Sequence, residues 1–437
     1  MRHLARIEVL GLFNEFDHYI ELSDEPYATI LSGPNGSGKT QTLRLVQAAF
    51  DFDLTHLASA PYQTLVLTFQ KGEILNVSRD ATRKGEFVAL TFKATYPDSR
   101  RDHVLRIPRD EVFGMPEESR WIPYNSKISI SDSHLVVGEG RFDSYILNPE
   151  ATQEMAVLSD LTSYLAKTPW LKGLLKTEIV MIDTKRLHTA PPGSQKRAQS
   201  RKGRSILKAH LDRIEEQVTR AREASLVISQ ERDQSFPMRI LAEQPKPMRA
   251  ASIARLQGMY DEVHALGEEL HSNGLSALPE LMEFPDRQLT PFERRILTQF
   301  VTDWRKKFGP LLPVSEKLRA LRSILNDKLR HKAVEYDSAD GLRFRSKRTG
   351  RVIPVDSLSA GEQHLVVLFV ALLFSATPGS IVLIDEPEIS MHAAWKHAFL
   401  DDISRVAKIQ DLQVILATHS TAIIKGRWEL VQEIGVE

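Results

Sequence analysis

Residues 33–40 form a glycine-rich stretch whose residue types and spacing suit phosphate binding. The sequence Gly33-Pro34-Asn35-Gly36-Ser37-Gly38-Lys39-Thr40 fits the pattern G-x-x-x-x-G-K-[ST]. Its glycines permit a tight turn in which backbone N–H groups face phosphate oxygens. The Lys39 ammonium would contact the β- and γ-phosphates, and the Thr40 hydroxyl would bind Mg²⁺. The expected ATP contacts are Asn35, Gly36, Ser37, Gly38, Lys39, Thr40 and Gln41.

Two acidic residues follow an apolar run near the C-terminus. Residues 381–384 are Ile-Val-Leu-Ile, and Asp385 and Glu386 come directly after them. A buried parallel strand would deliver both carboxylates to its C-terminal edge, where ligands bind in α/β sheets. Asp385 is placed to hold Mg²⁺, and Glu386 is then free to orient or deprotonate the attacking water. A solvated acidic turn is the alternative, which the phosphate-binding loop disfavours.

The stretch Leu358-Ser359-Ala360-Gly361-Glu362-Gln363 precedes a strongly apolar segment. Ser359, Gly361 and Glu362 could open a helix at a phosphate. The same residues also fit a plain capping box, in which Ser359 and Glu362 cap the helix reciprocally. The local chemistry is the same in both interpretations. Residues 358–363, an apolar helix and an acidic strand follow one another within residues 358–387. This order favours the phosphate-binding interpretation over the plain capping box.

A third apolar run, Val414–Ala417, leads through Thr418 to His419. A single histidine at a strand end is usually structural. Here it follows three other nucleotide motifs in order, which favours a catalytic role for His419.

These motifs together resemble the RecF/OLD-like ABC-type ATPases. Residues 358–363 resemble the signature motif of that superfamily, although Ala360 stands where many relatives have Gly or Ser. Four further stretches resemble the ATPase component of PARIS-type anti-phage defence systems: Ile182–Leu187, Ser235–Leu241, Leu358–His364 and Ala417–Trp428.

The resemblance implies an α/β fold, an ABC/SMC-type P-loop head with an added antiparallel sheet and an inserted helical, coiled-coil-like domain. It implies a homodimer in which ATP lies between the loop of one subunit and the signature of the other, and higher homo-oligomers. His419 would be the switch that contacts the γ-phosphate, and Ile389–His392 would be the D-loop. For the Q-loop, Asp183, Thr184 and Arg186 are the candidates.

The resemblance also implies partners. The chain ends soon after the histidine strand, and the Toprim nuclease domain of OLD proteins is not expected in it. The toxic activity would then belong to a separate Toprim-like or DUF4435-type effector that this ATPase holds. A phage protein would trigger its release.

The resemblance, together with the chain break at Pro191–Ser194, implies three segments: residues 1–190 as the N-terminal half of the head, 191–335 as a helical insertion, and 336–437 as the C-terminal half. Strands are expected over segments with alternating or continuous apolar residues: Ala5–Val9, Tyr19–Leu22, Ala28–Leu31, Thr64–Phe69, Ile74–Val77, Glu86–Phe92, Glu178–Asp183, Leu342–Arg345 and Val352–Val355. Residues 100–148 are expected to be irregular, and Thr152–Leu165 to be helical.

Within the insertion, two apolar seams have heptad-like spacing. One runs from Leu207 to Ile228 and the other from Ile253 to Leu270. A coiled-coil arm and an ordinary helical subdomain both fit seams of this length. Further helices are expected over Pro291–Phe308 and Val314–His331.

Composition limits the remaining choices. Lys and Arg number 57, as do Asp and Glu, so a bulk nucleic-acid or membrane binder is not implied. The absence of cysteine excludes disulfides, thiol nucleophiles and a zinc-hook repair ATPase, and no signal peptide is seen, so a cytoplasmic location is expected.

The alternative function is a RecF/SMC-like DNA repair or recombination ATPase. Basic residues support it, although the zero net charge favours an ordinary solvated charged surface for them: Lys196, Arg197, Arg201, Lys202, Arg204, Lys208, Arg343, Arg345, Arg348 and Arg351. A transporter subunit fits poorly.

Overall fold

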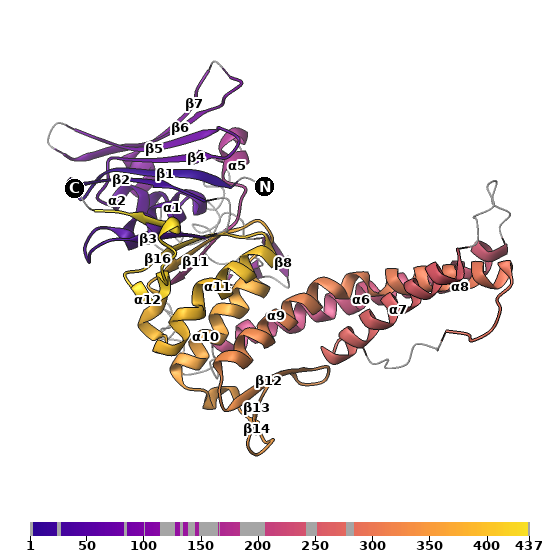
Figure 1. The fold of residues 1–437 in the computed structure, drawn as a ribbon. Helices are drawn as coiled ribbons and strands as arrows, with labels where there is room; N and C mark the ends of the chain where they lie inside the picture. Colours follow the sequence, from indigo (N-terminus) through magenta and orange to yellow (C-terminus); the bar gives the residue numbers. More distant parts are fainter. Residues whose placement is uncertain are drawn as a thin grey trace. The chain divides into compact units, whose positions relative to one another are not determined.

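The computed structural model divides the chain into two compact units. Met1–Pro192 and Ser375–Glu437 form the first, and Gly193–Phe374 form the second. The residues described are 3–23, 28–82, 85–99, 101–113, 127–131, 134–138, 145–147, 165, 167–183, 206–241, 251–276 and 284–435. The first unit contains two layers of β-sheet, and the second contains the long helices (Figure 1). The α/β class and the helical insertion predicted from the sequence are confirmed.

A parallel sheet organises the first unit. Its strand order is β11-β15-β16-β3-β17, and every neighbouring pair is parallel. The strands are β3 (Ala28–Ser32), β11 (Ile179–Asp183), β15 (Ile381–Asp385), β16 (Gln413–Ala417) and β17 (Val431–Glu433). Every residue of β15 and β16 is buried, which explains their continuous apolar runs. Asp183, Asp385 and Ala417 are register partners across three strands, so the strand ends are level.

An antiparallel sheet forms the second layer of this unit, in the order β2-β1-β4-β5-β6-β7. The strands are β1 (Leu4–Leu12), β2 (Phe16–Glu21), β4 (Thr64–Phe69), β5 (Ile74–Ala81), β6 (Phe87–Thr95) and β7 (His103–Pro108). Alternation predicted most of them, because one face of the sheet is buried. β7 lies in the segment expected to be irregular, so that expectation was wrong. Its side chains are exposed except at Leu105 and Ile107, which left no clear alternation to read.

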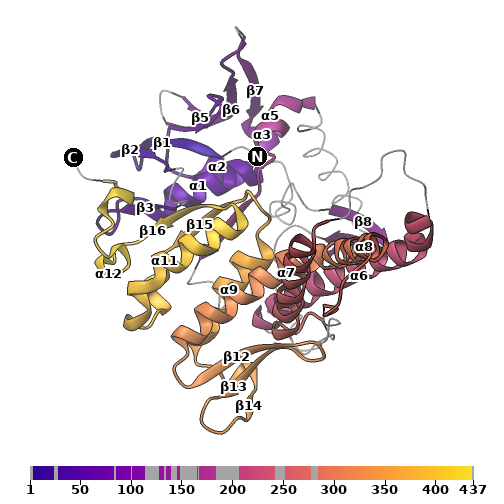
Figure 2. The same cartoon turned by 45° about the vertical axis from the view of Figure 1, so that its right-hand side comes forward.

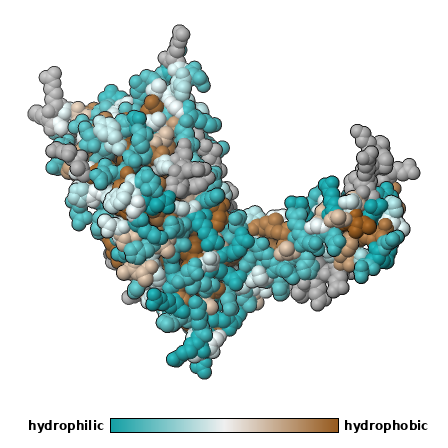
Figure 3. All heavy atoms as spheres, viewed as in Figure 1, coloured by the Kyte–Doolittle hydropathy of each residue, from teal (hydrophilic) through white to brown (hydrophobic). Residues whose placement is uncertain are grey.

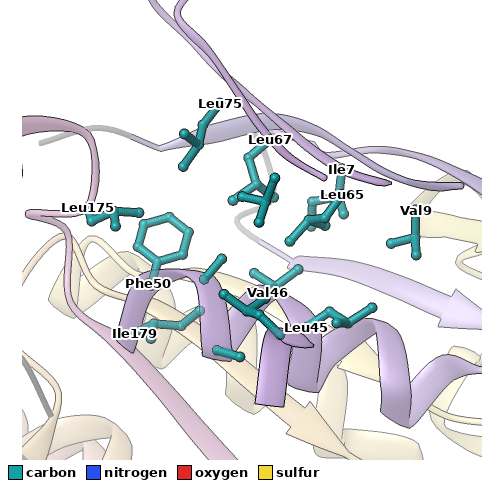
Figure 4. Packing of buried hydrophobic residues seen from close by; sticks show 14 of the residues in the cluster. Ile7, Val9, Leu45, Val46, Phe50, Leu65, Leu67, Leu75, Leu175 and Ile179 are labelled. Atoms are coloured by element: carbon teal, nitrogen blue, oxygen red, sulfur yellow. The ribbon is translucent and has the colours of Figure 1, made fainter. Parts of the chain in front are cut away.

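Helix α1 (Lys39–Asp51) lies between the two sheets. Figure 4 shows Leu45, Val46 and Phe50 of this helix facing apolar side chains of the antiparallel strands, with Ile179 of β11 nearby. The buried cluster joins both sheets to the helix. The helix that follows the phosphate-binding loop is therefore fixed by the main core of the unit. Burial of apolar side chains in this core stabilises the folded state by on the order of 25 cal/mol for each Å² of apolar surface removed from water.

Other helices complete the first unit. They are α2 (Leu54–Ser59), α3 (Arg109–Phe113), α5 (Pro169–Leu174), α11 (Ala393–Gln410) and α12 (Thr421–Ile424). A separate antiparallel sheet contains β8 (Lys127–Ser131), β9 (His134–Gly138) and β10 (Tyr145–Leu147), also within the segment expected to be irregular. The helix expected over Thr152–Leu165 lies outside the described residues apart from Leu165. No helix among the described ranges is long and apolar enough to cross a membrane.

The second unit is built on long helices that run side by side in both ribbon views (Figures 1 and 2). They are α6 (Ile206–Leu241), α7 (Ile253–Ser272), α8 (Pro291–Phe308) and α9 (Leu312–Lys328). α6 packs on α8 and α9, and α7 packs on the same two helices. The two seams therefore face a shared helical core, as in the helical-subdomain interpretation. Ile214 and Val218 of α6 and Leu256 and Leu270 of α7 are buried.

The exposed face of this unit is mixed in character. Polar residues cover most of the face seen in Figure 3, and apolar residues appear between them along the helices. The most exposed large apolar side chains on α6 are Leu226, Val227, Met238 and Leu241.

Residues 336–374 belong to the helical unit, whereas the predicted boundary after residue 335 assigned them to the head. Here β12 (Lys332–Asp337), β13 (Gly341–Ser346) and β14 (Val352–Ile353) form a three-stranded antiparallel sheet. Helix α10 (Ala360–Val370) follows and packs on α6 and α9. The alternating pattern of these strands did not indicate that they form a separate sheet rather than join a sheet of the head. The first boundary, expected after residue 190, falls after Pro192.

Candidate functional site

The phosphate-binding loop follows β3, and the two acidic residues follow or end β15. Because β3 and β15 flank β16 in one parallel sheet, their C-terminal ends share an edge with the strand that leads to His419. Three motifs that are far apart in the sequence therefore meet at one edge of the sheet.

Glycine is required at specific positions of the loop. Gly36 and Gly38 have φ values of 88° and 89°, in the left-handed region that side chains disfavour. A Cβ atom on Gly33 would lie 2.3 Å from the carbonyl oxygen of Ile434, so the backbone passes too close for any side chain. Gly38 is the N-cap of α1, and the helix therefore begins at Lys39 with its N-terminus in the loop.

The Lys39 side chain is folded back over the loop. Its Nζ donates hydrogen bonds to the carbonyl oxygens of Gly33 at 2.7 Å and Pro34 at 2.9 Å. Burial lowers the pKa of Lys39, and the nearby carboxylates of Glu386 and Asp385 oppose that shift. Hydrogen bonds to main-chain oxygens thus hold the Lys39 ammonium beside the acidic residues, and a bound phosphate could replace these hydrogen bonds.

Thr40 and Asp385 are in direct contact although 345 positions separate them. The Thr40 hydroxyl lies 3.0 Å from Asp385 Oδ1 and 2.9 Å from Oδ2. Asp385 is buried, with 3% of its surface exposed. A hydroxyl and a carboxylate in contact, next to a phosphate-binding loop, fit Mg²⁺, which uses few protein oxygens and completes its shell with phosphate and water. Within the described residues, no cluster of three or more His, Asp or Glu residues offers a metal site.

Glu386 occupies a strained turn directly after β15. Its φ of 43° is left-handed, and its backbone N–H donates to the Ala417 carbonyl oxygen at 2.9 Å. His419 Nδ1 lies 4.0 Å from Glu386 Oε1. The structure thus brings the predicted base and the predicted switch histidine together.

Glu388 was not among the predicted site residues, yet it contacts the same histidine. It lies in the 3-10 helix Pro387–Ser390, is 7% exposed, and its Oε1 lies 3.4 Å from His419 Nδ1. The acidic run Asp385-Glu386-Pro387-Glu388 was its signal in the sequence, but the run does not reveal which acid turns inward.

The signature stretch lies in the helical unit and begins α10. Ser359 is the N-cap, and its capping box with Glu362 is present. Glu362 Oε2 also accepts a hydrogen bond from Lys332 Nζ at 2.5 Å. Burial raises the pKa of Glu362, but the hydrogen bonds from Lys332 and Ser359 outweigh it, so the pKa is lowered overall. The geometry of the capping-box interpretation is therefore observed. A phosphate role for Ser359, Gly361 and Glu362 remains a prediction.

The remaining predicted residues have varied surroundings. Asn35 is exposed and Ser37 is buried. Gln41 Nε2 lies 3.4 Å from His56 Nε2. In the D-loop stretch, His392 caps α11 by accepting from the Ala394 backbone N–H. Of the Q-loop candidates, Asp183 ends β11 beside Asp385, while Thr184 and Arg186 lie outside the described residues.

The basic residues offered for DNA binding are only partly described. Residues 196–204 lie outside the described ranges. On β13, Arg343 pairs with Asp337 and Asp340, and Arg345 pairs with Glu335 at 3.0 Å. These two arginines are therefore neutralised by acidic neighbours, as on an ordinary charged surface.

Comparison with known families gives one match. The model of the family described as "AAA domain, putative AbiEii toxin, Type IV TA system" matches residues 220–425. This part of the chain is similar to an AAA ATPase domain. The matched range contains Ser359, Asp385, Glu386 and His419, but not the phosphate-binding loop.

Solved structures of SMC heads are also similar. The Smc head domain with an extended coiled coil, bound to the C-terminal domain of ScpA derived from Pyrococcus furiosus, is 14% identical; the match covers 97% of this chain and 91% of that one, with a TM-score of 0.35. The SMC head domain from Thermotoga maritima is 10% identical over 99% of this chain and 94% of that one, with a TM-score of 0.33. No curated protein matches the chain.

Proposed function

We propose that this protein binds and hydrolyses ATP as an ABC-type ATPase. The observation that carries the proposal is the Thr40–Asp385 contact, in which the end of the phosphate-binding loop meets the buried strand acid. Glu386 and His419 lie at the same sheet edge. This set of groups serves a nucleotide triphosphate and its metal ion.

Each side chain has a distinct task in this proposal. Lys39 and the loop N–H groups bind the phosphates, and Thr40 and Asp385 hold Mg²⁺, which supplies charge neutralisation when bound. Glu386 orients and deprotonates the attacking water. His419 contacts the γ-phosphate and so distinguishes ATP from ADP. Ser359 and the α10 N-terminus of a second copy complete the site in a head-to-tail homodimer.

The ATPase further serves, in this proposal, as the sensor and scaffold of an anti-phage defence system. It holds a separate Toprim-like or DUF4435-type effector and releases it when a phage protein appears. Two observations support this role: the resemblance of four stretches to defence ATPases, and a family description that mentions a toxin and a toxin–antitoxin system.

The catalytic part is tested with purified protein. The wild type should release phosphate from ATP in the presence of Mg²⁺. Lys39→Ala should lose nucleotide binding, measured by calorimetry, because the β/γ contact is removed. Lys71→Ala, in an exposed turn outside the site, is the matched control and should behave as wild type. ATP binding and turnover unaffected by Lys39→Ala would overturn the assignment.

The defence part is tested in cells. The tagged chain is expressed together with the product of the neighbouring gene, and the complex is purified and identified by mass spectrometry. A stable complex that dissociates on phage infection is expected, with reduced phage plating. If no partner copurifies and plating is unchanged by the operon, the sensor role is wrong while the ATPase assignment stands.

A further inference from the structure

Glu388 ties together the two chain segments that carry Glu386 and His419. Its Oε1 accepts a hydrogen bond from Thr418 Oγ1 at 2.6 Å and from the His419 backbone N–H at 3.1 Å. The same oxygen lies 3.4 Å from the His419 ring nitrogen Nδ1. One carboxylate oxygen therefore fixes the main chain at the end of β16 and lies beside the His419 ring.

The burial of the three side chains separates their tasks. The Glu388 side chain is 5% exposed, the Glu386 side chain 17%, and the His419 side chain 48%. Glu388 is thus shielded behind the two groups that face the sheet edge. It can act on a nucleotide only through its neighbours.

The second carboxylate oxygen of Glu388 adds a cost. Oε2 is buried, and no group in the described part of the chain hydrogen-bonds to it. Burying a carboxylate with one oxygen unsatisfied is unfavourable. The two hydrogen bonds that Oε1 accepts need an acceptor oxygen but not a negative charge. The charge instead suits the imidazole 3.4 Å away.

We infer that Glu388 is a positioning residue for His419, and this inference rests on the proposed ATPase function. Its carboxylate draws the imidazole proton to Nδ1 and so leaves Nε2 directed away from Glu388, toward solvent and an incoming γ-phosphate. Because Glu388 is two residues after Glu386 in the same turn, it also fixes the distance between the base and the histidine.

Three substitutions separate charge from anchoring. Glu388→Gln can keep both accepted hydrogen bonds through its amide oxygen, while the charge is lost. Thr418→Val removes one donor and keeps the charge. His419→Ala removes the group through which Glu388 is inferred to act. Glu86→Gln, at an exposed position of the β5–β6 connection, is the matched control for removal of a carboxylate.

The experiment is a double-mutant cycle on steady-state ATP hydrolysis, with MgATP affinity measured separately. Glu388→Gln should lower kcat at least tenfold and leave the affinity within about twofold, and Thr418→Val should lower kcat less. In the His419→Ala background, Glu388→Gln should have no further effect, because the residue acts through the histidine. Glu86→Gln should match the wild type.

Two outcomes would overturn the inference. One is a Glu388→Gln effect that is as large without His419 as with it; the other is a wild-type rate in Glu388→Gln. Thermal unfolding of each variant identifies loss of fold, and Glu388→Asp, which restores the charge one methylene shorter, should recover part of the rate if the variant is folded. Absence of hydrolysis by the wild type would instead refute the proposed function.

Discussion

At the scale of single residues, Gly36 and Gly38 share a backbone conformation but differ in surroundings. Both have φ near 90°. A Cβ on Gly36 would have open space, whereas one on Gly38 would lie 2.4 Å from Leu12 Cδ2. The two positions therefore separate backbone strain from steric conflict.

This difference predicts the stability of two alanine variants. Gly36→Ala should destabilise the first unit by roughly 1–2 kcal/mol, because a residue with a Cβ atom is strained in the left-handed backbone region. Gly38→Ala should cost more, because Leu12 must also move. The measurement is urea unfolding followed by tryptophan fluorescence or circular dichroism. Equal losses for the two variants would contradict the described packing under the loop.

Side chains that meet in the structure could be predicted from the sequence where both belong to a recognised motif. Thr40 and Asp385 were both assigned to Mg²⁺ from the sequence, and the structure places them in contact. Glu388 was not predicted, because its inward turn depends on the positive φ of Glu386 and on the Thr418 hydroxyl. Neither feature has a signature in the linear pattern.

At the scale of elements, Lys332 of β12 supports the start of α10. Its ammonium contacts Glu362, which closes the capping box with Ser359. Lys332→Ala should destabilise the helical unit by about 1.5–3 kcal/mol, the range for charged hydrogen bonds, and Lys332→Arg should retain most of the stability.

The same pair predicts a pH dependence. The pKa of Glu362 is lowered in the folded state, so its contribution is present above the unfolded pKa of about 4.5 and is lost as the pH falls through the folded value. The difference in unfolding free energy between wild type and Lys332→Ala should therefore shrink below about pH 4.5. A difference that stays constant down to pH 3 would exclude the ion pair as its source.

A second element-scale contact joins α6 to α8. Arg239 donates two hydrogen bonds to Asp303, at 2.8 Å and 2.7 Å, and the Asp303 side chain is 6% exposed. Asp303→Asn should destabilise the helical unit by roughly 2–3 kcal/mol, because the guanidinium loses a charged partner. Asp233→Asn breaks the pair with Lys307, in which the Asp233 carboxylate is exposed, and should cost less than about 1 kcal/mol. Chemical unfolding of both variants makes the comparison.

Element bounds were predictable where burial imposes a period. Thr64–Phe69 and Pro291–Phe308 have the predicted limits, since one sheet face and one helix stripe are buried. β12 escaped prediction because only Val334 and Tyr336 alternate inward in it. The second domain boundary was misplaced for a related reason: alternation identifies a strand without identifying the sheet that it joins.

At the scale of the whole molecule, the proposed mechanism requires a second copy of the chain. Each copy would contribute its phosphate-binding loop to one nucleotide and its Ser359 to the other. ATP would then be shared across two subunits, and hydrolysis would weaken the contact.

The Glu386→Gln variant tests this arrangement, because it removes the proposed base and leaves the loop and Asp385 intact. With MgATP it should accumulate as a closed dimer or a multiple of it, while the wild type returns to its resting state as ATP is consumed. Light scattering after size-exclusion chromatography measures the mass. Adding Ser359→Arg, which places a long cation at the α10 N-terminus, should abolish the ATP-dependent increase without removing ATP binding. If Glu386→Gln has the same mass with and without MgATP, and hydrolyses ATP at the wild-type rate, then neither the base assignment nor the shared site is correct.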